Sequence, residues 1–128
     1  MCSSGLLGLL TIICSSVKSD EFRIGFLPTL SPMNRHSESK YHVGALVYAL
    51  EKINNDPNRL KGHTLTYVYN DTRAHALTSI RGMTSQYKAD VLAFIGPEDK
   101  CETEAQIAAA WNVPMITYVS RVIYMFIT

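Results

Sequence analysis

Polar side chains gather in two segments that each follow a short apolar run. Asn70, Asp71 and Thr72 come directly after one run, and residues 96–99 (GPED) come directly after another. Such segments combine carboxylates and hydroxyls with the unpaired N–H groups of a following helix, and together these can hold an anion or a polar ligand group. The candidate ligand-binding residues are therefore Asp71, Thr72, Gly96, Pro97, Glu98 and Asp99.

Two other interpretations of these residues remain open. Asp71, Thr72 and Asp99 are of the types that cap helices, which is a commoner role than ligand binding. Asn70-Asp71-Thr72 is also an N-x-T sequon, so Asn70 is a candidate glycosylation site in a secreted chain. A glycan at a strand end that faced a cleft would obstruct ligand binding there.

No set of residues in the sequence indicates catalysis. The motifs of nucleophile elbows, zinc proteases and dinucleotide sites are absent, and no cysteine pair has metal-ligand spacing. His36, His42, His63 and His75 are spread over predicted loops and helix starts, which favours a solvated surface role. We expect no enzyme, no metal site and no cofactor.

Apolar patterning predicts four strands that alternate with three helices. The strands are expected at 22–27, 65–69, 91–95 and 114–118, and the helices at 41–55, 77–87 and 99–111. The first helix is the clearest, because Val43, Leu46, Val47, Leu50 and Ile53 recur three and four residues apart. Asp99 and Glu102 have the spacing of a capping pair, and Trp111 is expected to anchor the core or domain edge.

This alternation predicts an α/β fold with a parallel sheet and helices on both faces, because parallel neighbours need crossover connections. The continuous apolar run 91–95 indicates a strand that is buried on both faces. Ligands of open parallel sheets gather at the carboxyl ends of the strands. The loops after residues 27, 69 and 95 are therefore expected to form the binding edge.

The first 19 residues have the layout of a signal peptide, with an apolar stretch at 6–14 followed by small residues. That stretch is too short to span a bilayer, which needs about 20 apolar residues. Removal of this leader would take away Cys2 and Cys14 and leave Cys101 as the single cysteine. A lone thiol in a secreted chain indicates either an absent partner or a buried side chain that packs as a small hydrophobe.

The sequence divides into a leader at 1–19, a partial lobe at 20–118 and a divergent apolar tail at 119–128. The tail is interpreted as the end of a truncated or alternatively ended product, because a further parallel strand would need a crossover first. An additional edge strand is the alternative. With 12 basic and 11 acidic residues scattered along the chain, nucleic acid is not an expected partner.

Two stretches of the chain resemble a known family. They are GALVYALEKINNDPNRLKGHTLTYVYNDT and VLAFIGPEDKCETEAQIAAAWNVPMITY, and their most specific elements are Gly96-Pro97, Cys101, Trp111 and Pro114. Residues 22–118 resemble the amino-terminal lobe of the extracellular ligand-binding region of receptor-type guanylate cyclases. The similarity is to the natriuretic-peptide-receptor-like group, and the residues AAAWNVPMITY resemble arthropod members most.

The resemblance implies a type I periplasmic-binding-protein-like fold, of which this chain covers part of the first lobe. It implies a full-length receptor on the extracellular face of the plasma membrane that binds a peptide or small molecule and makes cyclic GMP, with a possible homodimer. Family members pair the cysteine near Gly-Pro with another cysteine, and the partner of Cys101 is absent. A secreted binding or decoy module and an amino-acid-type receptor lobe are the alternatives.

Overall fold

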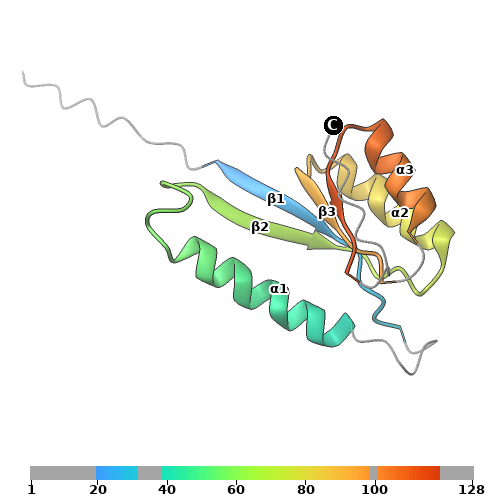
Figure 1. The fold of residues 1–128 in the computed structure, drawn as a ribbon, viewed down its shortest axis with the longest axis horizontal. Coiled ribbons are helices and arrows are strands. Elements are labelled where there is room, and N and C mark those ends of the chain that lie inside the picture. Colours follow the sequence, from blue (N-terminus) through green and yellow to red (C-terminus); the bar gives the residue numbers. More distant parts are fainter. Residues whose placement is uncertain (1–19, 32–38, 99–100, 119–128) are drawn as a thin grey trace, which may run out of the picture.

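The computed structural model describes residues 20–31, 39–98 and 101–118. The predicted leader and tail, His36 and Asp99 lie outside these described residues. Strands and helices alternate in the predicted order, and only their boundaries shift by a few residues (Figure 1). The elements are β1 (Glu21–Phe26), α1 (Ser39–Asn54), β2 (Thr64–Tyr69), α2 (Ala76–Tyr87), β3 (Ala93–Ile95), α3 (Glu102–Ala110) and β4 (Met115–Ile116).

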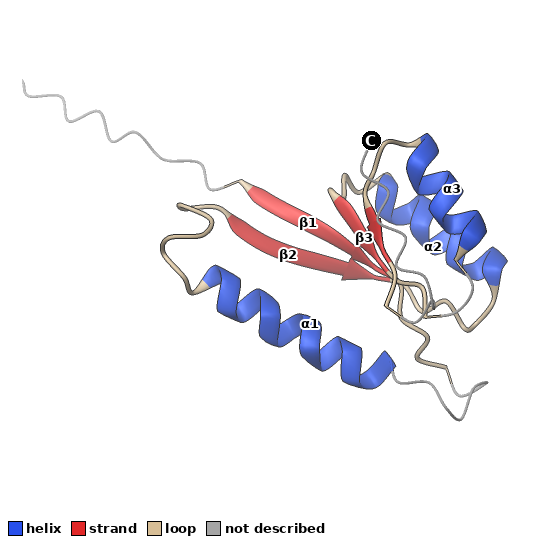
Figure 2. Ribbon diagram, viewed as in Figure 1, coloured by secondary structure: helices blue, strands red, loops and turns tan. Residues whose placement is uncertain are grey.

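The four strands form one parallel sheet in the order β2-β1-β3-β4, which confirms the predicted α/β class. Helix α1 lies on one face of this sheet, and α2 and α3 lie on the other (Figure 2). Because β1 sits between β2 and β3, the chain reverses its direction of travel across the sheet at β1. The carboxyl ends of β1 and β3 therefore form a topological switch point, where open α/β sheets bind ligands.

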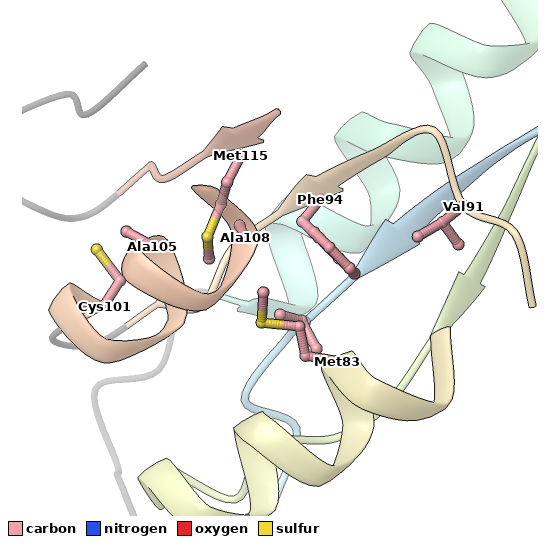
Figure 3. Packing of buried hydrophobic residues seen from close by; sticks show 8 residues of the cluster. Met83, Val91, Phe94, Cys101, Ala105, Ala108 and Met115 are labelled. Atoms are coloured by element: carbon pink, nitrogen blue, oxygen red, sulfur yellow. The ribbon is translucent and has the colours of Figure 1, made fainter. Parts of the chain in front are cut away.

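The buried core lies between the sheet and the α2–α3 pair. Phe94 of β3 and Met115 of β4 meet Met83 of α2 and the small side chains Ala105 and Ala108 of α3 (Figure 3). The alanines of α3 let the helix approach the sheet closely and keep Met115 covered. Trp111 packs against the margin of this core and stacks on Tyr87 with 4.4 Å between ring centroids, which confirms its predicted anchoring role.

The face that carries α1 is less well covered. Of the predicted apolar stripe of α1, only Leu50 is buried, whereas Val43, Leu46, Val47 and Ile53 are half-buried. Helix α1 packs against β2, at the sheet margin, and leaves β3 uncovered on that face. The prediction that 91–95 is buried on both faces was therefore wrong: Ala93 and Ile95, which point to the α1 face, are only partly buried.

Helix α3 begins later than the sequence predicts. Its first residue is Glu102, and its N-cap residue is Cys101, which makes no side-chain capping hydrogen bond. The predicted capping pair was therefore wrong, because Glu102 lies at the first helical position rather than three residues into the helix. The Cys101 side chain belongs to the buried core, so this residue turns inward before the helix starts.

Candidate functional site

The loops that follow β1 and β2 are tied together at the carboxyl edge of the sheet. The hydroxyls of Thr29 and Thr72 are 2.7 Å apart, and both side chains are buried. The backbone N–H of Thr72 also donates to the carbonyl of Pro28 at 2.8 Å. Thr72, a predicted site residue, is thus held from both its side chain and its backbone.

Asp71 adds a carboxylate clamp across the same two loops. Its side chain accepts hydrogen bonds from the N–H of Leu30 at 2.9 Å, from the N–H of Arg73 at 3.0 Å and from the hydroxyl of Ser31. Burial, the largest single influence, raises the pKa of Asp71, but the bonds from Ser31, Leu30 and Arg73 together outweigh it and lower the pKa. Asp71 is therefore an ionised carboxylate at neutral pH. The groups that donate to it are already engaged within the protein and are not available to a ligand.

The alternative that Asp71 and Thr72 cap a helix was wrong. Helix α2 begins at Ala76, its N-cap residue is His75, and that residue makes no side-chain capping bond. Arg73 and Ala74 intervene in the left-handed region, with φ of 54° and 51°, so the chain makes a turn before it becomes helical. Two non-glycine residues of this kind in succession are uncommon, and they displace the helix from the polar segment.

Asn70 lies against α2. Its Oδ1 accepts a hydrogen bond of 3.0 Å from Nε2 of Gln86, a fully buried side chain that also donates to the carbonyl of Phe26 at 2.9 Å. A Cβ on Gly82 of α2 would come within 2.7 Å of Cβ of Asn70, which shows how tightly this side chain is packed. Glycosylation of Asn70 stays a prediction, and the glycan would have to leave from this contact.

Gly96 and Pro97 reach the β1 loop from the opposite side. Gly96 has φ of 102°, and a Cβ there would meet the carbonyl oxygen of Leu27 at 2.7 Å, so only glycine fits. Its N–H donates to the carbonyl of Ile116 at 2.9 Å, and Pro97 is buried. The loop after β1 is therefore fixed by Asp71 and Thr72 on its β2 side and by Gly96 on its β3 side.

Sequence reasoning missed two aromatic side chains at this edge. His42 of α1 lies 4.3 Å from Tyr118 between ring centroids, and the ring of Tyr118 is 6.4 Å from that of Phe26. His42 is half-buried rather than solvated as predicted, and so is His63, which packs 5.1 Å from Phe22. A signal for His42 existed, because it precedes Leu46 and Leu50 of the apolar stripe at intervals of four residues.

Cys101 is buried, and the structure describes it as a free thiol. Burial raises the pKa of this thiol, and the negative charge of Glu104 raises it further. A protonated, buried thiol is a poor nucleophile and a poor metal ligand. Among the described residues, no three His, Cys, Asp or Glu side chains cluster in a way that could hold a metal ion.

Within residues 20–31, 39–98 and 101–118, no helix has the length and apolar character that crossing a membrane requires. The described site is thus an edge of three interlocked loops that carries the carboxylates of Asp71 and the half-buried Glu98, the hydroxyls of Thr29 and Thr72, and an aromatic pair.

Comparisons with known proteins agree with this architecture. Residues 43–123 match the family described as "Receptor family ligand binding region". Guanylate cyclase 32E of Drosophila melanogaster is 36% identical over 104 residues, which cover 78% of this chain and 8% of that protein. Receptor-type guanylate cyclase Gyc76C of the same species is 30% identical over 95 residues, which cover 74% of this chain and 6% of that protein.

The Speract receptor of Strongylocentrotus purpuratus is 32% identical over 77 residues, which cover 60% of this chain and 7% of that receptor. The chain thus spans less than a tenth of the length of these relatives. No solved structure matches it. Because the family match covers more than half of its residues, the chain belongs to the receptor family that shares this ligand-binding region.

Proposed function

We propose that this chain forms the start of the ligand-binding lobe of a receptor guanylate cyclase, displayed or secreted outside the cell. In its full-length form, the receptor would couple binding of an extracellular peptide or small molecule to cyclic GMP synthesis, as a homodimer. The 36% identity to Guanylate cyclase 32E supports this assignment. The observation that carries it is the β1 loop, which is pinned from both sides at the switch point of the sheet.

Asp71 and Thr72 act in this proposal as positioning residues. The carboxylate of Asp71 already receives the N–H groups of Leu30 and Arg73, so these donors are engaged within the protein. The hydroxyl of Thr72 is likewise hydrogen-bonded to that of Thr29. Ligand groups would instead meet other parts of these loops, among them Glu98, which is half-buried. Preformed loops of this kind lower the entropy lost on binding.

The chain itself would perform no catalysis. Its matches fall within a ligand-binding region, and among its described residues no metal cluster or activated thiol offers chemistry. The purified chain should therefore convert no GTP to cyclic GMP above a blank without protein. Reproducible conversion by the purified chain would contradict this part of the proposal.

A chimaera tests the receptor assignment. Residues 20–118 would replace the matching segment of Guanylate cyclase 32E, and surface display and basal cyclic GMP would be measured in cells. We expect both within about twofold of the parent, because a homologous lobe should pack on the rest of the receptor. An unrelated parallel α/β segment of equal length is the control.

The same chimaera tests the site. Asp71→Asn should release the β1 loop and lower surface display, whereas Asp90→Asn, at an exposed turn, should leave it unchanged. Equal display by the chimaera and by the unrelated control segment would overturn the receptor assignment. Stabilisation of the purified chain by L-glutamate would favour the amino-acid-type lobe instead.

A further inference from the structure

Strand β2 lies at one margin of the sheet (Figure 1). Among the described strands it pairs with β1 alone, so its other side is a free edge. A free strand edge presents backbone N–H and C=O groups with which a strand of another chain can pair. Whether such pairing happens at β2 depends on the residues of the strand and on what covers its edge.

The sequence of β2 itself offers no protection against pairing. Its six residues, TLTYVY, include no charged side chain and no proline, and all except the leucine are β-branched or aromatic. Charged side chains and prolines are the means by which natural edge strands prevent pairing. A six-residue segment of high β-propensity that lacks both is of the kind that stacks in cross-β assemblies. Protection of this edge therefore has to come from outside the strand.

The backbone groups of β2 point alternately toward β1 and toward the free edge. The N–H groups of Thr64 and Asn70 each donate, at 3.1 Å, to a carbonyl of β1 or of the residue before it. Successive residues of a strand direct their N–H and C=O groups to opposite sides. Leu65, Tyr67 and Tyr69 therefore direct theirs to the free edge, where a partner strand would bond to them.

The side chain of Asn54 covers the first of these positions. Asn54 is the last residue of α1, and its Oδ1 accepts a hydrogen bond from the N–H of Leu65 at 2.8 Å. Its Nδ2 donates to the carbonyl of the same leucine, also at 2.8 Å. An amide side chain carries the same kind of donor and acceptor as a peptide group. Asn54 therefore bonds to both backbone groups of Leu65 as a neighbouring strand would.

The connection from α1 to β2 holds Asn54 in this position. Within it, the carboxylate of Asp56 accepts hydrogen bonds from the N–H of Asn58 at 3.0 Å and from Nε of Arg59 at 3.1 Å. A turn that is ordered by its own hydrogen bonds returns the chain to β2 with Asn54 opposite Leu65. The contact with the strand edge is thus built into the helix end and the turn that follows it.

We propose that the carboxamide of Asn54 takes the place of a neighbouring strand and keeps the edge of β2 from pairing with β2 of a second copy of the chain. A second copy fits this edge because two identical strands can pair antiparallel about a two-fold axis. Since β2 carries no charge, no like-charge repulsion opposes that pairing. The inference is independent of the proposed receptor function, because it concerns how the chain protects its own sheet.

Substitution of Asn54 in the full chain tests the proposal. Asn54→Ala removes both hydrogen bonds and should shift the chain to dimers or larger species in sedimentation velocity over about a hundredfold range of concentration. Asn55→Ala is the matched control, because Asn55 is also an exposed asparagine but follows the end of α1. Adding Tyr69→Lys to Asn54→Ala should restore the distribution of the unmodified chain, since Tyr69 is 58% exposed and a charge on the edge opposes pairing.

A folded Asn54→Ala variant that assembles no more than Asn55→Ala would overturn the proposal, and so would assembly that persists after Tyr69→Lys is added. Amide hydrogen exchange of the unmodified chain gives a second measurement that needs no variant. The N–H of Leu65 should exchange at least about tenfold more slowly than that of Tyr67, which points to the same edge without the Asn54 carboxamide. Equal exchange of these two amides would contradict the proposal even if Asn54→Ala failed to fold.

Discussion

The two faces of the sheet are made by the same four strands, yet one is sealed and the other is not. On the α2–α3 face, Met83, Phe94 and Met115 are almost inaccessible to solvent. The face on the α1 side, here called the open face, carries Tyr69 and Ile116, which are about half exposed. Strand alternation supplies apolar residues to both faces equally. Coverage differs because the connections β2–β3 and β3–β4 travel in the same direction and place both helices on one face.

The difference between the two faces predicts that a truncation at Phe94 lowers the free energy of unfolding far more than a truncation at Ile116. Phe94→Ala would leave a cavity within a packed core and should lower the free energy of unfolding by about 3–5 kcal/mol. Ile116→Ala, on the open face, should cost less than about 1 kcal/mol in the same experiment if that position stays exposed. Urea unfolding followed by Trp111 fluorescence measures both. A loss at Ile116 as large as that at Phe94 would mean that the open face is sealed in solution.

A substitution at Gly96 tests the packing at the carboxyl edge of the sheet, directly after β3. Gly96→Ala should cost about 1–3 kcal/mol, because φ of 102° disfavours a side chain and the new Cβ would press on the carbonyl of Leu27. Gly62→Ala is the matched control, since Gly62 has φ of 95° but open space around it. The difference between the two variants isolates the close approach of β1 to the turn. Equal losses would mean that only the backbone conformation matters at Gly96.

The order and type of the elements could be predicted from the sequence because they depend on local periodicity. The stripe of α1 and the apolar runs of the strands are visible without tertiary information. Coverage of the faces could not be predicted, since it depends on β1 lying between β2 and β3, and no single segment encodes that order. The burial predicted for 91–95 failed for this reason.

The position of the candidate site residues in the fold could be predicted from the sequence, but their hydrogen-bond partners could not. Asp71, Thr72 and Gly96 do lie at the carboxyl edge that strand order selects. Their partners could not be foreseen, because Asp71 bonds to residues 30 and 31, some forty positions away. The capping interpretation failed because Arg73 and Ala74 adopt left-handed backbone conformations. Arginine and alanine rarely adopt such conformations, so they could not be expected from the sequence.

Acid should weaken the loop clamp. The folded pKa of Asp71 is lowered, so its ionised form contributes stability above the unfolded pKa of about 4, and that contribution is lost as pH falls through the folded pKa. Asp71→Asn should therefore reduce stability at neutral pH and flatten the loss of stability in acid. Urea midpoints across this pH range measure the effect, with Asp90→Asn as the control. An unchanged acid profile in Asp71→Asn would show that other carboxylates govern it.

Two helical glycines should give effects of opposite sign and small size. Gly44 of α1 has open space around the position of a Cβ, so Gly44→Ala should raise the free energy of unfolding by about 0.5–1 kcal/mol through helix propensity alone. Gly82 of α2 faces Cβ of Asn70 at 2.7 Å, so Gly82→Ala should lower it, because the helix would have to move from the sealed face. The same substitution thus reports helix propensity on one face and packing on the other. If Gly44→Ala also destabilised the chain, the space beside α1 would be filled in solution, which is the result expected where another segment lies against that helix.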